Sequence, residues 1–456
     1  MSGTVPTLGA GERQLLLDCA RLELGDRLVQ RTEGLLRSDL DWDRTLLFAE
    51  AHSVGPLLHR QLQRLDGWAE VPASARQRLL RLTHRTEYRN RLYSAALSEL
   101  LELFAGGGVP VIVLKGLSLV ELIYGDLSLR PLIDLNLLIP RTHLTAARTL
   151  LLRHGYIETV SRGSPFYRWT HSQLVIEKPG PFRLFLMLQW DLLTWPRMHA
   201  IDLPRFWRDA QPVQLSGRDA RIPSPVDFVL YLCLQADKYA FLNALALDLR
   251  DPAEFVFDES TYNRLIRFTD LNEVIRHYEE RIDWTELAER ARAGGIEESV
   301  SASLRCVERL FRPAIPPAVL EALRSAPPRR LRQLACRALL ESENRESDGR
   351  LDTRLVNWWR RREAPIQRRW IKRLDLVEFI FPRRDVVRRR HQPAWGRAAA
   401  LAYPVHVCGA LLRCALHLPG WTYGRLRGRL SRRSRLGPPA PASGRPPLSH
   451  QGLGPV

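Results

Sequence analysis

The chain has 456 residues, and its 45% hydrophobic and 26% charged residues are ordinary for a globular protein large enough for two or three lobes. Its formal net charge of +18 is unevenly placed, because residues 354–456 hold 22 basic and 4 acidic side chains, which leaves 46 of each in residues 1–353. The neutral first part excludes a general attraction of that part to nucleic acid or acidic lipid, so only the C-terminal segment can supply one.

The sequence shows no sign of export, of a membrane span or of a disulfide framework. Its six cysteines are scattered without a C-x-x-C pair, which favours buried free thiols in a reducing compartment over disulfides or a zinc site. Residues 1–10 are polar and small, and no stretch reaches the roughly 18 consecutive apolar residues of a membrane helix. We therefore expect a cytoplasmic protein.

Residues 1–105 are predicted to form an N-terminal helical region. Leucine, tryptophan and alanine recur at a spacing of about 3.6 residues, the break at Val54-Gly55-Pro56-Leu57 restarts the pattern, and residues 76–103 form a long amphipathic helix. Residues 106–108 are all glycine, but they precede the next strand instead of following it, which favours a linker over a phosphate-binding loop.

Residues 111–140 are predicted to fold as strand, turn, helix, loop and strand. Val111–Leu114 is a continuous apolar, mostly β-branched run, typical of a buried strand, and Lys115-Gly116 ends it at a sharp turn. Leu117–Tyr124 places apolar residues at helical spacing, and Leu132–Ile139 forms the second strand.

Two polar residues interrupt this second strand. Asp134 and Asn136 are two positions apart, so their side chains point to the same face, close to the turn at Gly116. Polar groups on an otherwise apolar strand cost free energy unless they bind something. This strand face is therefore the candidate ligand site.

The rest of a core spanning residues 106–200 adds a helix and a hairpin. Residues 143–154 have a helical apolar face that ends at Gly155, a typical helix cap. Residues 174–177 and 184–190 are predicted strands joined by the turn dipeptide Pro179-Gly180.

A helical domain is expected next, over residues 201–353. Its predicted helices, from periodicity and turn signals, span residues 225–239, 271–278, 284–293 and 300–311.

The segment with Lys115-Gly116, an arginine loop at Arg130 and the pattern Asp134-x-Asn136 resembles the uncharacterised bacterial nucleotidyltransferase family of the DNA polymerase β superfamily. The resemblance extends from about residue 40 to about residue 390. It implies an α/β (α+β) polymerase β-like core with a small mixed sheet, flanked by helical lobes. It also implies transfer of a nucleoside monophosphate from an NTP to an acceptor, assisted by Mg²⁺; the acceptor stays open.

The resemblance assigns catalytic and metal-binding roles to Asp134, which matches the first carboxylate of the family motif. The second carboxylate is replaced by Asn136, assigned to the metal as a neutral ligand, and the third by Met187, while Gln189 stands at a histidine position. Mg²⁺ prefers carboxylates, so this degenerate motif predicts weak metal binding. The nearest acids that could compensate are Asp126, Glu177 and Asp191.

Five residues are candidates for nucleotide binding, each with a structural alternative. By resemblance, Lys115 and Gly116 position the triphosphate, and Lys238 is a further phosphate contact, although both lysines could simply be solvated. Ser118 could donate to phosphate or cap its helix. Arg130 could clamp a phosphate or pair with Asp134.

The C-terminal residues 354–435 interleave arginine clusters with aromatic residues and include an apolar run at 398–418. This composition permits binding to an anionic membrane surface, binding to nucleic acid, or packing as an arginine-rich helical lobe. Residues 436–456 are rich in Pro, Gly and Ser and are expected to be disordered.

Three functions therefore remain open from the sequence. The first is nucleotidyl transfer with a weakened metal site. The second is a catalytically inactive nucleotide-binding or scaffold protein, that is, a pseudoenzyme. The third is an adaptor that acts at the membrane periphery or on nucleic acid through residues 354–435.

Overall fold

A computed structural model of the protein describes residues 8–158, 172–193, 200–236, 256 and 264–323. All of them belong to the first of the two units into which the chain divides, Met1–Asp375. The basic region 354–435, the tail 436–456 and Lys238 lie outside the described residues. The boundaries between the five expected regions stay predictions.

Helices open the described chain, as the apolar periodicity predicted. Asp41 caps one of them by accepting a hydrogen bond from the backbone N–H of Arg44. Another starts at Gly55-Pro56, where the sequence pattern restarts. The helices are α1 (Ala10–Cys19), α2 (Asp26–Leu36), α3 (Trp42–Ala51), α4 (Gly55–Gln63) and the 34-residue α5 (Ala73–Gly106), with a 3-10 turn η1 (Asp66–Glu70) before α5.

A mixed five-stranded sheet forms the centre of the fold, in the order β1-β2-β5-β4-β3. Its strands are β1 (Ile112–Lys115), β2 (Leu135–Leu138), β3 (Ile157–Glu158), β4 (Gln173–Lys178) and β5 (Leu184–Gln189). Only the β2–β5 pair is parallel; β1–β2, β3–β4 and β4–β5 are antiparallel. The small mixed sheet within an α/β core is thus confirmed.

The connection between β1 and β2 departs from a regular helix. Gly116 has a φ of +82°, which a residue with a side chain rarely adopts, so the strand can turn abruptly into the next helix. That helix has one α-helical turn, α6 (Leu117–Leu119), and then the π-helical η2 (Val120–Tyr124), where one α-helix was expected. After β2, the 3-10 turn η3 (Arg141–His143) leads into α7 (Leu144–Arg153).

A helix and a second, two-stranded sheet follow the central sheet and were not predicted. They are α9 (Leu203–Asp209), β6 (Gln211–Leu215) and β7 (Arg218–Ile222). The hairpin turns at Ser216-Gly217, both with positive φ, which is the backbone of a tight two-residue hairpin loop. Glu121 of η2 fixes this turn by accepting hydrogen bonds from the Ser216 N–H and hydroxyl, each at 2.8 Å.

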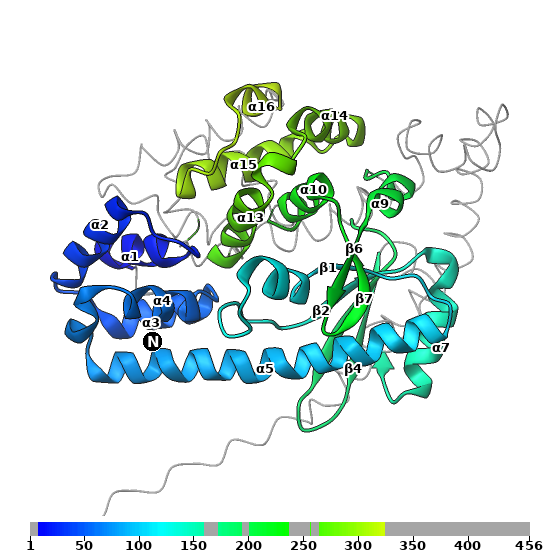
Figure 1. Cartoon of the computed structure of the whole chain (residues 1–456), viewed down its shortest axis with the longest axis horizontal. Coiled ribbons are helices and arrows are strands. Elements are labelled where there is room, and N and C mark those ends of the chain that lie inside the picture. Colours follow the sequence, from blue (N-terminus) through cyan, green and yellow to red (C-terminus); the bar gives the residue numbers. More distant parts are fainter. Residues whose placement is uncertain (1–7, 159–171, 194–199, 237–255, 257–263, 324–456) are drawn as a thin grey trace, which may run out of the picture. The chain divides into compact units, whose positions relative to one another are not determined.

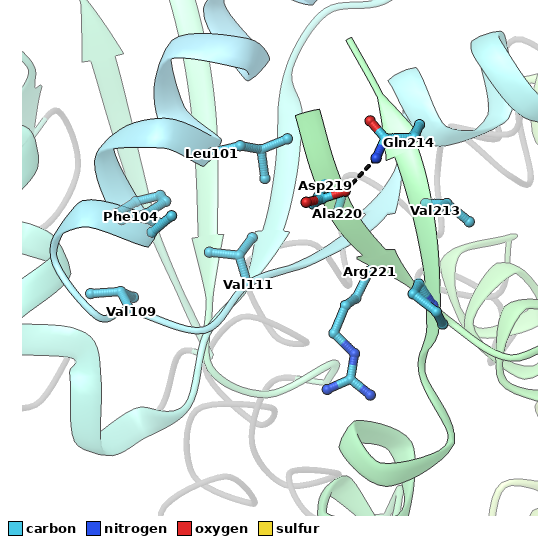
Figure 2. A pocket seen from close by; sticks show the side chains of 11 residues that line it. Leu101, Phe104, Val109, Val111, Val213, Gln214, Asp219, Ala220 and Arg221 are labelled. Carbon is cyan, nitrogen blue, oxygen red and sulfur yellow. Dashed lines mark hydrogen bonds between the residues drawn. The ribbon is translucent and has the colours of Figure 1, made fainter. Parts of the chain in front are cut away.

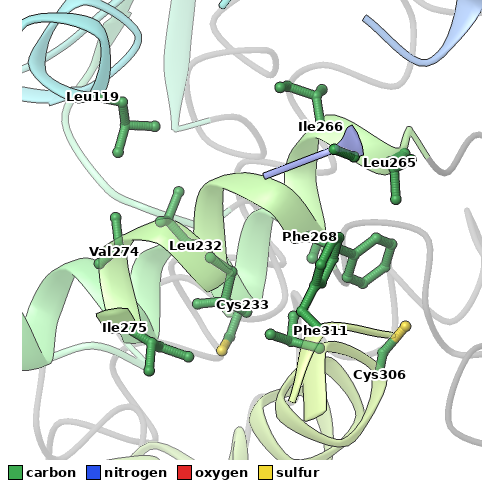
Figure 3. Close-up of a cluster of buried hydrophobic side chains, with 14 of the residues drawn as sticks. Leu119, Leu232, Cys233, Leu265, Ile266, Phe268, Val274, Ile275, Cys306 and Phe311 are labelled. Atoms are coloured by element: carbon green, nitrogen blue, oxygen red, sulfur yellow. The ribbon is translucent and has the colours of Figure 1, made fainter. Parts of the chain in front are cut away.

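Helices also close the described chain. They are α10 (Pro225–Ala236), α13 (Leu265–His277), the 3-10 turn η4 (Glu279–Arg281), α14 (Trp284–Gly294), α15 (Glu297–Phe311) and α16 (Pro317–Ala322). Their apolar faces meet in a buried cluster, where Figure 3 shows Cys233 of α10, Val274 of α13 and Phe311 of α15. No helix among the described residues has both the length and the apolar character needed to cross a membrane.

The two faces of the sheet pack on different hydrophobic clusters. On one side, α5 and α7 cover apolar residues of β1, β2, β4 and β5 (Figure 1). On the other side, Ile112 and Leu138 join a larger cluster with α10, α13, α15 and the helices α1–α4. The N-terminal and C-terminal helices therefore share one core. The described cysteines Cys19, Cys233 and Cys306 are buried free thiols.

Candidate functional site

A β-bulge in β1 turns the side chain of Lys115 to the face of the sheet that carries Asp134 and Asn136, here called the polar face. Ile112 pairs with Leu138 and Val113 with Leu137, but Lys115 pairs with Asn136, so Leu114 is the extra residue. A bulge reverses the alternation of side chains along its strand. Lys115 consequently lies on the same face as Asn136.

Asp134, Asn136 and Gln189 form a line of hydrogen bonds on this face. The Asn136 amide donates to Asp134 Oδ1 at 2.9 Å, and the Gln189 amide donates to Asn136 Oδ1 at 3.2 Å. A carboxylate can only accept, so the NH₂ group of Asn136 must face Asp134 and its oxygen must face Gln189. Asn136 and Gln189 are buried, while Asp134 is partly exposed.

The register of β2 and β5 fixes the neighbours of Asn136. Asn136 pairs directly with Met187 across the parallel strands, and Gln189 follows two residues later on the same face. Met187 therefore stands beside Asn136, at the position where the resemblance predicted the third carboxylate. A thioether is a poor ligand for a hard cation such as Mg²⁺.

Helix α10 lies over the polar face. Gln235 Oε1 contacts Lys115 Nζ at 3.5 Å, a long hydrogen bond. Burial lowers the pKa of Lys115, and the Asp134 carboxylate opposes this shift. Burial raises the pKa of the Tyr231 hydroxyl; the neighbouring Gln189 opposes the rise, and Asp134 adds to it. Helix α10 thus contributes two polar side chains to the site.

Arg130 forms a buried ion pair with Asp270 of α13. Its Nε and Nη2 donate to the two carboxylate oxygens at 2.7 and 2.6 Å, and the Tyr124 hydroxyl donates to Asp270 at 2.8 Å. This pairing favours a structural role for Arg130, one of its two alternatives, with Asp270 and not Asp134 as its partner. Sequence reasoning missed Asp270 because it lies far away in the chain.

Ser118 is completely buried, and its hydroxyl has no hydrogen-bond partner within the described part of the chain. The residue that caps the helix is Gly116, without a side-chain hydrogen bond. The described contacts therefore show neither of the two roles considered for Ser118.

The three acids nearest to the predicted metal positions have other contacts. Glu177 accepts two hydrogen bonds from Arg183, at 2.5 and 2.7 Å, and these lower its pKa. Asp126 accepts from the N–H of Ser128 in an exposed turn. Asp191 is buried and accepts from a backbone N–H.

The donor atoms at the site do not fit the set of metal ligands that the resemblance implied. Asp134 supplies one carboxylate, and the amide oxygen of Asn136 is turned toward Gln189, away from any cation that Asp134 would hold. Among the described residues, no group of three or more His, Cys, Asp or Glu side chains is placed to hold a metal ion. No catalytic step through Mg²⁺ follows from this geometry.

A cavity of about 510 Å³ lies elsewhere, between the end of α5 and the β6–β7 hairpin (Figure 2). Phe104, Val111 and Val213 give it an apolar lining, with Arg221 at one side. None of the predicted site residues lines it.

Together, the mixed sheet, the Lys115-Gly116 turn and the Asp134-x-Asn136 strand define a nucleotidyltransferase-like α/β protein. Residues 38–312 match the model of a family described as uncharacterised nucleotidyltransferase, and the chain belongs to that family. The match ends well before residue 390, where the resemblance was expected to end. No curated protein and no solved structure matches the chain.

Proposed function

We propose that the protein binds a nucleoside triphosphate at the polar face formed by Lys115, Asp134 and Asn136, and transfers its nucleoside monophosphate only weakly to an acceptor. The family supports the class of substrate and of reaction. The acceptor is a peptide, a sugar, a protein or a small molecule.

One observation carries the proposal: the hydrogen-bonded line Asp134–Asn136–Gln189 beside the Lys115 ammonium group. Lysine is a common partner of phosphate, and Gly116 lets the backbone turn next to it. The same line contains a single carboxylate, so the site keeps a phosphate partner but has lost most of its negative metal ligands. Nucleotide binding is therefore better supported than fast transfer.

The test measures binding and transfer separately. Each of the four ribonucleoside triphosphates is titrated calorimetrically into the protein, and transfer is followed with α-labelled NTP and cell extract as the source of acceptors. We expect one or more NTPs to bind and Asp134→Asn to abolish any label transfer. The exposed acid Asp126 provides the control variant Asp126→Asn, which should change neither readout.

A protein that binds none of the four NTPs would overturn the proposal. Binding without any transfer would identify the second candidate, a catalytically inactive nucleotide-binding protein. The engagement of the Asn136 amide by both of its neighbours favours this second function.

A further inference from the structure

We infer that the site binds the triphosphate through the Lys115 ammonium group without a divalent cation, an inference that rests on the nucleotide binding proposed above. The positive charge that faces the phosphates is then the lysine and not a metal ion. The strand bulge, the charges around Lys115 and the engagement of the amides support it independently.

The bulge in β1 places a positive charge beside the remaining carboxylate of the motif. Lys115 lies opposite Asn136 in the sheet register, and Asp134 is the acid whose field acts most strongly on it. A divalent cation held by Asp134 would occupy this same region and would be repelled by the ammonium group. The lysine and such a cation are therefore alternatives at one position.

The charges of the site suit a polyanion. The charged groups that act on Lys115 are Asp134, Asp270, Arg130 and Arg267. Lys115 and Arg130 balance the two acids, and Arg267 adds a further positive charge. A site with three carboxylates would instead repel a triphosphate until metal ions neutralised it.

The two amides carry no negative charge that a metal ion would have to neutralise. Asn136 and Gln189 are neutral and hydrogen-bond to each other, so no buried anion is left uncompensated at their positions. Within the described part of the chain, the hydrogen bond of Lys115 is a long one, at 3.5 Å, with Gln235. A phosphate oxygen can replace this contact with a shorter, charge-assisted hydrogen bond.

The experiment is calorimetric titration of ATP, and of any other NTP that binds, into the full-length protein with excess EDTA and again with excess Mg²⁺. We expect the two affinities to agree within about threefold, because the protein supplies the cation itself. Binding only in the presence of Mg²⁺ would overturn this inference and leave the proposed function intact. Binding in neither condition would overturn the proposed function.

Two variants assign the effect to Lys115. Lys115→Met should lower the affinity measured in EDTA by about tenfold or more, while Lys115→Arg keeps most of it. Lys178, an exposed lysine paired with Glu99, gives the control variant Lys178→Met, which should bind as the original protein does. If Lys115→Met, checked for folding by circular dichroism, binds unchanged in EDTA, Lys115 is not the phosphate partner.

Discussion

Arg130 and Asp270 form a buried ion pair with two hydrogen bonds, although they are 140 positions apart in the chain. The pair joins the loop before β2 to helix α13 of the C-terminal part. Its geometry satisfies both carboxylate oxygens, and burial makes the loss of either partner costly.

Asp270→Asn should therefore destabilise the fold by about 3–5 kcal/mol, because it leaves the Arg130 charge buried without a counter-charge. Urea denaturation measures the effect. The exposed pair of Lys178 and Glu99, with an N–O distance of 2.8 Å, is the matched control. Glu99→Gln should cost less than about 1 kcal/mol. Equal losses of unfolding free energy in the two variants would show that the buried Arg130–Asp270 pair stabilises the fold no more than the exposed pair does.

His52 should make the stability depend on pH. It is buried and accepts a hydrogen bond from the Leu265 N–H, and burial, followed by the nearby Arg264, lowers its pKa from 6.5 to about 4. Between pH 6.5 and about pH 4, the His52 side chain is protonated in the unfolded chain but stays neutral in the folded chain. The contribution of neutral His52 to the free energy of unfolding is therefore fully present above pH 6.5, and about 3 kcal/mol of it is lost as the pH falls to about 4.

The measurement compares urea denaturation of the original protein and of His52→Asn from pH 7.5 to pH 4. The asparagine retains an acceptor for the Leu265 N–H but does not titrate, so its stability should fall less with pH. Replacement of the exposed His84 by glutamine should leave the pH dependence unchanged. Identical curves for the His52 variant and the original protein would show that His52 is not the group responsible.

Asn136→Asp should make the fold depend on magnesium. The new carboxylate would lie next to Asp134, where the amide now donates at 2.9 Å, so repulsion replaces a hydrogen bond. We expect a loss of about 2 kcal/mol or more in EDTA and its recovery on addition of Mg²⁺, which gains a second hard ligand. Differential scanning calorimetry with and without Mg²⁺ tests this. Equal Mg²⁺ effects on both proteins would mean that position 136 is not a metal position.

Ser118→Ala should stabilise the protein by up to about 1 kcal/mol, because it removes a buried hydroxyl that has no partner among the described residues. The buried Ser303, whose hydroxyl donates to the Cys233 carbonyl at 2.9 Å, is the control; its alanine variant should be destabilised. Thermal denaturation compares the two variants. If Ser118→Ala instead weakens NTP binding measurably, Ser118 is a phosphate contact as the sequence first suggested.

The basic region 354–435 should govern any binding to polyanions, since residues 1–353 are formally neutral. Replacement of Arg360, Arg361 and Arg362 by glutamine should weaken sedimentation with anionic vesicles by about 1 kcal/mol per arginine that lies near the surface. Vesicle binding should persist in part at higher salt, because apolar burial is not screened, whereas RNA or DNA binding should fall linearly in log salt. If the protein binds neither vesicles nor nucleic acid at low salt, the third alternative holds, and residues 354–435 are a packed helical lobe.

The sequence predicted most of the central fold because its signals there are local. The apolar runs before Lys115 and around Asn136 and the turn at Pro179-Gly180 marked four strands, and the shared face of Asp134 and Asn136 is confirmed by their hydrogen bond. The β6–β7 hairpin escaped detection because its strands alternate weakly, although Ser216-Gly217 is a recognisable turn signal.

Contacts between distant segments could not be predicted from a single sequence. Nothing near Arg130 indicates that its partner is Asp270, and nothing near Gln189 indicates that Tyr231 of α10 lies beside it. Spacing along one strand shows which residues share a face. It does not show which helix covers that face, so the environment of Lys115 emerged only from the fold.

The bulge between Val113 and Lys115 also constrains how this chain can change in evolution. A shift in pairing that sets Leu114 opposite Asn136 would restore regular alternation and turn the lysine toward the apolar layer under α5, leaving Asp134 without its neighbouring cation. A substitution to aspartate at position 136 would be tolerated more readily after such a shift in pairing, because a metal ion could then enter. Changes in the pairing register of this strand, more than point substitutions alone, would therefore separate lineages that depend on metal from lineages that do not.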